Sequence, residues 1–347
     1  MTIKTPLFFL IKSLPVKYSQ KNNGFTITEM MIAISIGVVL MAGISQIYLS
    51  SKQTYAMNDE LIAFQENGRY ITSRIAGEVR MAGHAGCVDT FERGMQFAAA
   101  DFNAATRDFY ITPIQVFEYS ATASPNPSLP NGTTAPAVDI LSPVAAANSD
   151  IISIQYGSYV LNQITADMSS TNANINVNAS NSLMQDIIPG NMLIIADCDM
   201  ANVFIAGDPS SNSVVSHSAL SKTFSQMESG LWPTVMHFIS NTYYVGTNNG
   251  VNALYVRDNI SGNTAKIFEG IQSMDILYGV RDSSGSRYMD GDAIVAANLM
   301  NNIFSTRISF NLQSRKQVDT ATASGTSKDY ITKQFTSTVV LRNQGDW

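Results

Sequence analysis

The sequence predicts an α+β protein in which one long N-terminal helix packs on a mostly antiparallel β-sheet domain. No proline occurs between Phe25 and Ile111, so a long uninterrupted helix is allowed there. Apolar residues recur at helical spacing up to residue 81, and beyond residue 85 they recur at every second position. The chain has 347 residues, which is enough for one large domain or two small ones.

The first 24 residues form a basic segment that contains four lysines and no acidic residue. The run from Phe25 to Tyr48 follows, and its only formal charge is Glu29. At a rise of about 1.5 Å per residue, this run is long enough to cross a hydrocarbon layer of roughly 30 Å. Because basic flanks stay in the cytoplasm, we expect the N-terminus there and the body on the other side of the membrane.

The helix is expected to continue to Met81 as an amphipathic segment, giving a helix of about 55 residues and about 80 Å. Charged residues such as Glu78 can occupy the faces outside the apolar stripe, and Asn67-Gly68 weakens the middle. Met81-Ala82-Gly83 with Gly86 ends the helix. The apolar stripe comprises Leu61, Phe64, Ile71, Ile75 and Val79.

The body beyond residue 85 is expected to consist mainly of strands. Asn249-Gly250 lies between two candidate strands and is typical of a hairpin turn. Residues 120–138 and 166–185 are rich in proline or in asparagine and serine, and we expect long loops there. The candidate strands are 150–157, 192–196, 203–206, 242–245, 254–257, 275–280, 307–313 and 337–342.

The composition favours an exported protein. Charged residues make up 14% of the chain, whereas about a quarter is usual for soluble domains. Without the four lysines of residues 1–24, 17 basic side chains face 27 acidic ones, a net charge of −10. An acidic body argues against non-specific binding of nucleic acid.

The junction between the basic segment and the apolar run carries a processing signal. Lys21-Asn22-Asn23-Gly24 is followed by Phe25-Thr26-Ile27-Thr28-Glu29. This junction resembles the type IV prepilin signal, in which a basic leader ends in glycine and a glutamate lies four residues beyond the new N-terminal phenylalanine. The alternative is an ordinary secretory signal, which would be cut after the apolar run, near Ala42–Ser45.

The resemblance implies roles for Gly24, Phe25 and Glu29. A prepilin peptidase would cut after Gly24, and the new α-amine of Phe25 would be N-methylated. Glu29 would pair with that amine on a neighbouring subunit, which offsets the roughly 2.5–3.5 kcal/mol that a carboxylate costs in a membrane helix. The alternative is an interfacial carboxylate without a partner.

The expected organisation has three parts. Residues 1–24 form a leader that is removed. Residues 25–82 form the long helix, whose first half is transmembrane and later lies in the fibre core. Residues 83–347 form a β-rich periplasmic or extracellular domain.

Several short sequence blocks are spread along the chain: Gln65–Arg69, Met81–Cys87, Asp150–Gly157, Ala196–Phe204, Tyr243–Val245, Phe268–Val280 and Val339–Asn343. These blocks and their order resemble the PilW-type minor pilins, which implies a pilin-like fold. Residues 100–148 and 160–185 are not covered by the resemblance.

The resemblance implies a minor pilin that waits in the inner membrane and primes type IV pilus assembly at or near the tip. It also implies support of twitching motility, adhesion or DNA uptake. Its partners would be other pilins and minor pilins, the prepilin peptidase, the inner-membrane assembly platform and a tip adhesin. The alternatives are a minor pseudopilin of type II secretion, or a pilus-borne adhesin or DNA-binding module.

Enzymatic activity is not expected, and neither is a cofactor. The sequence contains no G-x-S-x-G, no phosphate-binding glycine loop and no H-E-x-x-H.

Cys87 and Cys198 would lie in the oxidising periplasm, where a bridge between them is the favoured interpretation. It would close a loop of about 110 residues and contribute on the order of 4–5 kcal/mol to stability. The alternative is two separate buried thiols. Asp197 and Asp199 flank Cys198, and we expect hydrogen-bonded residues at a strand end there rather than an acid–base pair.

Two further clusters resemble metal sites weakly. His84 and Cys87 form H-x-x-C, but only two other histidines remain as ligands, and no metal is expected. Asp282, Asp290 and Asp292 carry the oxygen ligands that calcium prefers. Their spacing does not match an EF-hand loop, so we expect a polar turn.

Overall fold

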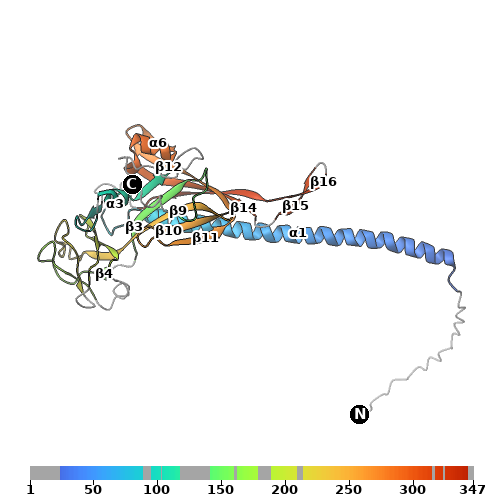
Figure 1. Ribbon diagram of the computed structural model, residues 1–347, viewed down its shortest axis with the longest axis horizontal. Coiled ribbons are helices and arrows are strands. Elements are labelled where there is room, and N and C mark those ends of the chain that lie inside the picture. The colour runs from blue at the N-terminus through green and yellow to red at the C-terminus, as the bar shows by residue number, and fades with distance from the viewer. Residues whose placement is uncertain are drawn as a thin grey trace, which may run out of the picture. The chain divides into compact units, whose positions relative to one another are not determined.

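The computed structural model describes residues 24–88, 95–102, 104–117, 141–159, 162–178, 189–208, 214–314, 317–322 and 325–342 (Figure 1). The chain divides into two compact units, Met1–Tyr55 and Ala56–Trp347.

A single helix, α1 (Ile27–Met81), spans 55 residues and confirms the predicted long helix (Figure 1). In the first unit, every large apolar side chain from Phe25 to Leu49 is more than half exposed. This part of α1 is long and apolar enough to cross a membrane.

In the second unit α1 buries a stripe of side chains, which confirms the predicted amphipathic segment. Gly83 follows the helix with a φ of 71°, the left-handed conformation that commonly ends helices. The amide of His84 donates a hydrogen bond of 2.8 Å to the carbonyl of Met81. The buried residues are Phe64, Gly68, Ile71, Ile75, Ala76 and Val79.

Two sheets make up most of the second unit, and each predicted strand overlaps a strand of the structure. Among the described residues, the larger sheet has nine strands: β1 (Met95–Phe97), β2 (Ile114–Phe117), β3 (Ile151–Gly157), β4 (Asn162–Gln163), β6 (Met192–Ala196), β7 (Ala201–Ile205), β9 (Thr234–Asn248), β10 (Val251–Asp258) and β11 (Thr264–Glu269). The smaller sheet has four described strands: β12 (Ile271–Asp282), β13 (Gly285–Met289), β14 (Ile303–Gln313) and β17 (Thr332–Val340).

Smaller elements complete the described part of the second unit. They are the strand pairs β5 (Ile175–Asn176) with β8 (Val214–Val215) and β15 (Val318–Thr322) with β16 (Gly325–Asp329), the helices α3 (Ala104–Tyr110) and α6 (Gly291–Ala297), and the 3₁₀ turn η1 (Met300–Asn302).

The strand order confirms a mostly antiparallel fold. The larger sheet runs β1-β7-β6-β9-β10-β11, with β3 and β4 also pairing with β9, and β2 with β3. The smaller sheet runs β13-β12-β14-β17. Among the described pairs only β1 and β7 run parallel.

The predicted hairpin joins β9 and β10, which lie side by side in Figure 1. Asn249 and Gly250 form its two-residue turn, with φ angles of 51° and 77°. Positive φ at both positions is what a turn of type I′ requires, and asparagine followed by glycine adopts it at low cost.

Both faces of the larger sheet are covered. On one face, Phe64 and Ile71 of α1 share a core with Ile154 and Tyr243, and Phe310 of the smaller sheet belongs to the same core. The second unit therefore places α1 against residues of both sheets.

A second core lies around Phe97, Phe109, Tyr244 and Tyr255. A third core gathers Leu193 and Phe204 with Ile175 and Phe224, beside the short strands β4, β5 and β8.

Strand β3 departs from simple alternation, because all seven of its residues are buried. Its apolar side chains include Ile154, which faces α1, whereas Ser153 belongs to a polar group. Ser153 bonds to Thr242, and the Asn259 amide donates to Ser240 Oγ at 2.9 Å and to Ser153 Oγ at 3.2 Å. Hydrogen bonding allows these polar side chains to be buried.

The two predicted loops are described only in part. Residues 120–138 lie outside the described residues, as do residues 179–185 of the second loop. The described part of the second loop contains the short strand β5 in addition to turns.

Candidate processing and assembly site

Glu29 lies in the first turn of α1, where it forms a capping box with Thr26. The amide of Thr26 donates to Glu29 Oε2 at 3.1 Å, and the Thr26 hydroxyl donates to the same oxygen at 2.9 Å. In return the amide of Glu29 donates to Thr26 Oγ1 at 3.3 Å. This reciprocal pair satisfies two amides that a helix N-terminus otherwise leaves without acceptors.

The capping box gives the carboxylate partners within its own chain. A charge that accepts local hydrogen bonds is less costly to place near a membrane surface than an unpartnered one. Thr26 caps the helix, and the sequence analysis did not single it out, although T-x-x-E before an apolar run is the known signature of a capping box.

Gly24 and Phe25 precede the helix. Gly24 is exposed, and a Cβ added there would meet nothing within 4 Å. Phe25 is 87% exposed. The structure therefore imposes no steric need for glycine at position 24.

Glu78, near the end of α1, forms a polar contact between the helix and the larger sheet. Asn241 Nδ2 donates to Glu78 Oε2 at 2.9 Å, and the Tyr243 hydroxyl donates to Oε1 at 2.5 Å. Tyr156 also hydrogen-bonds to this carboxylate. Glu78 lies outside the apolar stripe, as expected, and three donors from β3 and β9 hold the half-buried carboxylate against the sheet.

The environment of Glu78 raises the pKa of both tyrosines above the ordinary value of 10.0. Burial is the largest cause for each hydroxyl, and the negative charge of Glu78 adds to it. Tyr110 and Tyr244 also have a pKa raised by burial, to about 12, without a contribution from Glu78.

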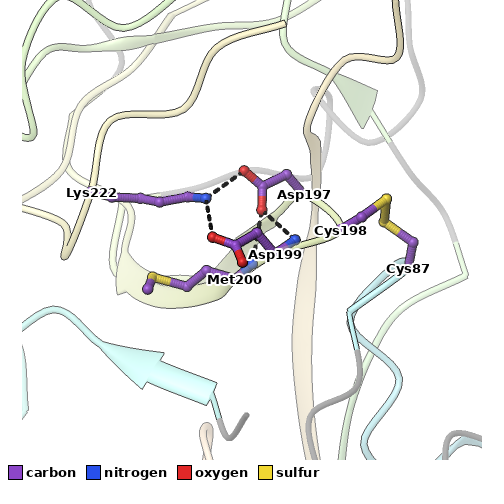
Figure 2. The surroundings of a disulfide bond; sticks show 6 residues. All are labelled: Cys87, Asp197, Cys198, Asp199, Met200 and Lys222. Carbon is purple, nitrogen blue, oxygen red and sulfur yellow. Dashed lines mark hydrogen bonds and ion pairs between the residues drawn. A yellow bond between two sulfur atoms is a disulfide. The ribbon is translucent and has the colours of Figure 1, made fainter. Parts of the chain in front are cut away.

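Cys87 and Cys198 form a disulfide, which confirms the favoured interpretation (Figure 2). Their Cα atoms are 4.8 Å apart and their sequence separation is 111. Cys87 follows the end of α1, and Cys198 lies in the turn between β6 and β7. The bridge therefore fastens the segment after the helix to the larger sheet.

The turn that carries Cys198 is built by Asp197 (Figure 2). Its Oδ1 accepts hydrogen bonds from the amides of Asp199 at 2.9 Å and Met200 at 2.8 Å. Lys222 Nζ lies 2.7 Å from Asp197 Oδ2 and 3.3 Å from Asp199 Oδ2. The two carboxylates are thus hydrogen-bonded residues after a strand, as expected, and they hold the turn in place.

Lys222 gave no signal in the sequence, because it lies 23 residues from Asp199 and outside any motif. Its side chain also lies over the ring of Phe224, with Nζ 5.3 Å from the centroid. These contacts add a cation between two carboxylates that would otherwise repel each other.

The two weak metal patterns are explained by other bonds. Cys87 cannot act as a thiolate ligand beside His84, because its sulfur is bonded to Cys198. Burial lowers the pKa of His84, and the positive charge of Arg342 lowers it further. Within the described residues no three His, Cys, Asp or Glu side chains form a group that could hold a metal.

Asp282 is the last residue of β12, and a polar turn, as predicted, leads from it into β13. Arg287 donates to both of its oxygens at 2.8 Å, and the amide of Ser284 donates to Oδ1 at 2.8 Å. The bidentate bond from Arg287 is the main reason why the pKa of Asp282 is below its ordinary value. Asp290 and Asp292 lie instead at the start of α6.

Two family models match the chain. Residues 242–343 match the type IV pilus-assembly protein W, and residues 19–45 match the prokaryotic N-terminal methylation motif. The first match begins within β9 and extends past β17, and the second contains Gly24, Phe25 and Glu29. No curated protein and no solved structure matches the chain significantly.

Both matches are to pilin or pilus-assembly families rather than to enzyme families. The methylation motif and the apolar part of α1 support a pilin that is anchored in the inner membrane. The body blocks that precede residue 242 lie outside the first match. Together, the two matches, the long helix and the antiparallel body support a PilW-like type IV pilin.

Proposed function

We propose that the chain is a minor pilin that primes assembly of a type IV pilus at or near its tip. A prepilin peptidase removes residues 1–24, Phe25 is N-methylated, and α1 holds the subunit in the inner membrane. The N-terminus faces the cytoplasm and the body faces the periplasm until the subunit joins other pilins in the fibre. The inner-membrane assembly platform and a tip adhesin complete the set of partners.

The exposed apolar surface of α1 is the observation that carries this proposal. Residues such as Met31, Val39 and Ile47 are each more than 60% exposed. Exposure to water costs about 1.5–3 kcal/mol for each large apolar side chain that burial would cover. Lipid removes this cost before assembly, and a bundle of sister helices removes it in the fibre.

The sharpest test separates the two bonds that Glu29 is able to make. Glu29→Gln keeps an amide oxygen for the capping box but removes the charge that would attract a neighbour's α-amine. Glu29→Val removes both. We expect both variants to be processed and inserted normally but to enter fibres poorly. The measurement is the amount of this chain in sheared pili.

Normal incorporation of Glu29→Gln beside poor incorporation of Glu29→Val would show that the cap alone matters and would defeat the pairing of charges. Wild-type incorporation of both variants would remove Glu29 from assembly altogether. Membrane fractions immunoblotted for the chain control for expression.

Gly24→Ala tests processing without disturbing the fold, because an added Cβ at this position meets nothing. We expect the leader to remain attached, with a correspondingly larger mass and no N-methylated Phe25 in mass spectrometry. Complete cleavage between residues 24 and 25 in this variant would contradict the assignment of the site.

Placement at the tip is argued from the size of the body, since a bulky domain crowds a tight helical shaft. Immunogold labelling should therefore be sparse and terminal, and dense labelling along the shaft would contradict tip placement.

The match to pilus-assembly protein W favours a pilus over a secretion pseudopilus. In a deletion strain, surface pili and twitching motility should fall while secretion of enzymes is unchanged.

A further inference from the structure

A short ribbon beside the third core presents a polar outer face. Strand β4 pairs with the start of β9, where Gln163 lies opposite Thr234. On its other side the same segment meets the β5 region, through a bridge between Ile164 and Val177. The amide of Thr165 continues this pairing with a hydrogen bond of 2.8 Å to the carbonyl of Asn176.

Side chains alternate across this ribbon. The inward positions are apolar and at most 2% exposed, as in Ile164, Val177 and Val235. The neighbouring positions Gln163 and Thr165 are exposed, Asn178 is exposed, and Trp232 is partly exposed. The alternation of a β-ribbon therefore places amides and a hydroxyl on one accessible surface. The indole of Trp232, which precedes β9, lies beside them.

These side chains line a cavity of about 590 Å³. Its wall is held by Asn162, which is 2% exposed and donates from Nδ2 to the carbonyl of Asn178 at 3.1 Å. Trp232 packs partly against the third core, so its ring is anchored at one side. The described lining contains no charged side chain. The volume lies within the roughly 300–1,000 Å³ that is usual for small-ligand sites.

We propose that this cavity binds a neutral saccharide. Sugars present many hydroxyls, and amide and hydroxyl side chains both donate and accept hydrogen bonds to such groups. The apolar C–H face of a sugar ring packs on a flat indole, which supplies contact area with little loss of side-chain freedom. The described part of the lining offers no countercharge to an anionic polymer.

The proposal goes beyond fibre assembly and does not depend on it. The site lies on β4, β9 and the β5 region, and Glu29 plays no part in it. A purified chain that binds saccharide could still fail to enter a pilus, and the reverse also holds. Figure 1 labels β4, which locates the ribbon in the body.

The test uses the full chain in micelles of a zwitterionic detergent, because glycoside detergents carry a sugar of their own. The chain has two tryptophans, so Trp347→Phe leaves Trp232 as the single reporter. A printed array of neutral and acidic glycans selects the probe, with maltotetraose and chitotetraose titrated in addition. We expect saturable change in Trp232 fluorescence with at least one neutral oligosaccharide.

Variants in the same background locate the site. Gln163→Ala and Asn178→Ala each remove one exposed amide and should weaken binding roughly 3- to 10-fold, the effect of one hydrogen bond. Asn174→Ala is the matched control, since Asn174 directly precedes β5 and is exposed but is not among the lining residues of the cavity. Unchanged thermal unfolding verifies that each variant is folded.

The absence of binding to every neutral glycan would overturn the proposal, and so would binding of acidic glycans alone. Equal affinities of the wild type and both lining variants would place the sugar elsewhere and would also overturn it. Weaker binding in the two lining variants, with Asn174→Ala unchanged, supports the site.

Discussion

At the scale of single residues, Gly68 shows how a helix can need glycine at a buried position. It continues the apolar stripe of α1 between Phe64 and Ile71, and it is itself buried. A Cβ at Gly68 would lie 2.5 Å from the ring of Phe335 on β17. That ring also contacts Phe64, with centroids 5.8 Å apart. Glycine therefore leaves room on the helix for the aromatic ring of Phe335.

Gly68→Ala should destabilise the body even though alanine favours helix. Overpacking costs about 1–3 kcal/mol, and the gain in helix propensity returns only about 1 kcal/mol. Denaturant unfolding measures the balance. Gly77→Ala is the control, because its added Cβ meets nothing, and it should stabilise by roughly 0.5–1 kcal/mol. A Gly68→Ala variant more stable than the wild type would contradict the predicted clash with the ring of Phe335.

At the scale of elements, α1 is positioned on the larger sheet by a polar contact as well as by its apolar stripe. Tyr156 and Tyr243 have a pKa raised by burial and by Glu78. Their contribution to stability is fully present below pH 10.0, the pKa of an unperturbed tyrosine. It is lost as the pH rises through their folded pKa. The body should therefore lose stability in alkaline solution.

Glu78→Gln should lower the pKa of both tyrosines, because the neutral amide no longer repels a phenolate. NMR of isotope-labelled tyrosine follows each hydroxyl. Tyr110 and Tyr244 are internal controls, because Glu78 makes no contribution to their pKa, which burial raises to about 12. Identical titration of Tyr243 in the variant and the wild type would show that the carboxylate does not act on it.

The elements that the sequence predicts well are those with a local cause. The long helix follows from the helical spacing of its apolar residues and from the absence of proline. The β9–β10 hairpin follows from Asn249-Gly250. The contact of Glu78 with the sheet left no sign in the sequence because its partners lie on β3 and β9, and Asn241 is 163 residues away. The contact of Lys222 with Asp197 and Asp199 could not be predicted from the sequence for the same reason.

Short strands were missed for a related reason. β1 has three residues and β4 has two, so neither offers enough positions for a period to appear. Their pairing with β7 and β9 is decided by the packing of the whole body. At the candidate assembly site the opposite holds, since Gly24, Phe25, Thr26 and Glu29 are adjacent in sequence and their pattern is readable without the fold.

At the scale of the whole molecule, the Cys87–Cys198 bridge closes a loop with a sequence separation of 111. In the chain-entropy account, such a loop restricts the unfolded chain by about 4–5 kcal/mol. The double variant Cys87→Ser and Cys198→Ser should therefore unfold at a clearly lower denaturant concentration. Wild-type protein in strong reductant should unfold at the same denaturant concentration as the double variant. If the double variant unfolded at the denaturant concentration that unfolds the oxidised wild type, a stabilising bridge would be contradicted.

Having two cysteines in the chain also simplifies biogenesis. One intramolecular pairing exists, so a mispaired isomer cannot form within a single chain and no shuffling enzyme is required. In the proposed orientation, Cys87 reaches the oxidising compartment before Cys198. An oxidase therefore has to act only once, after the later cysteine has crossed. Until then the first thiol can attack a small-molecule disulfide, which forms a mixed disulfide and releases one small thiol.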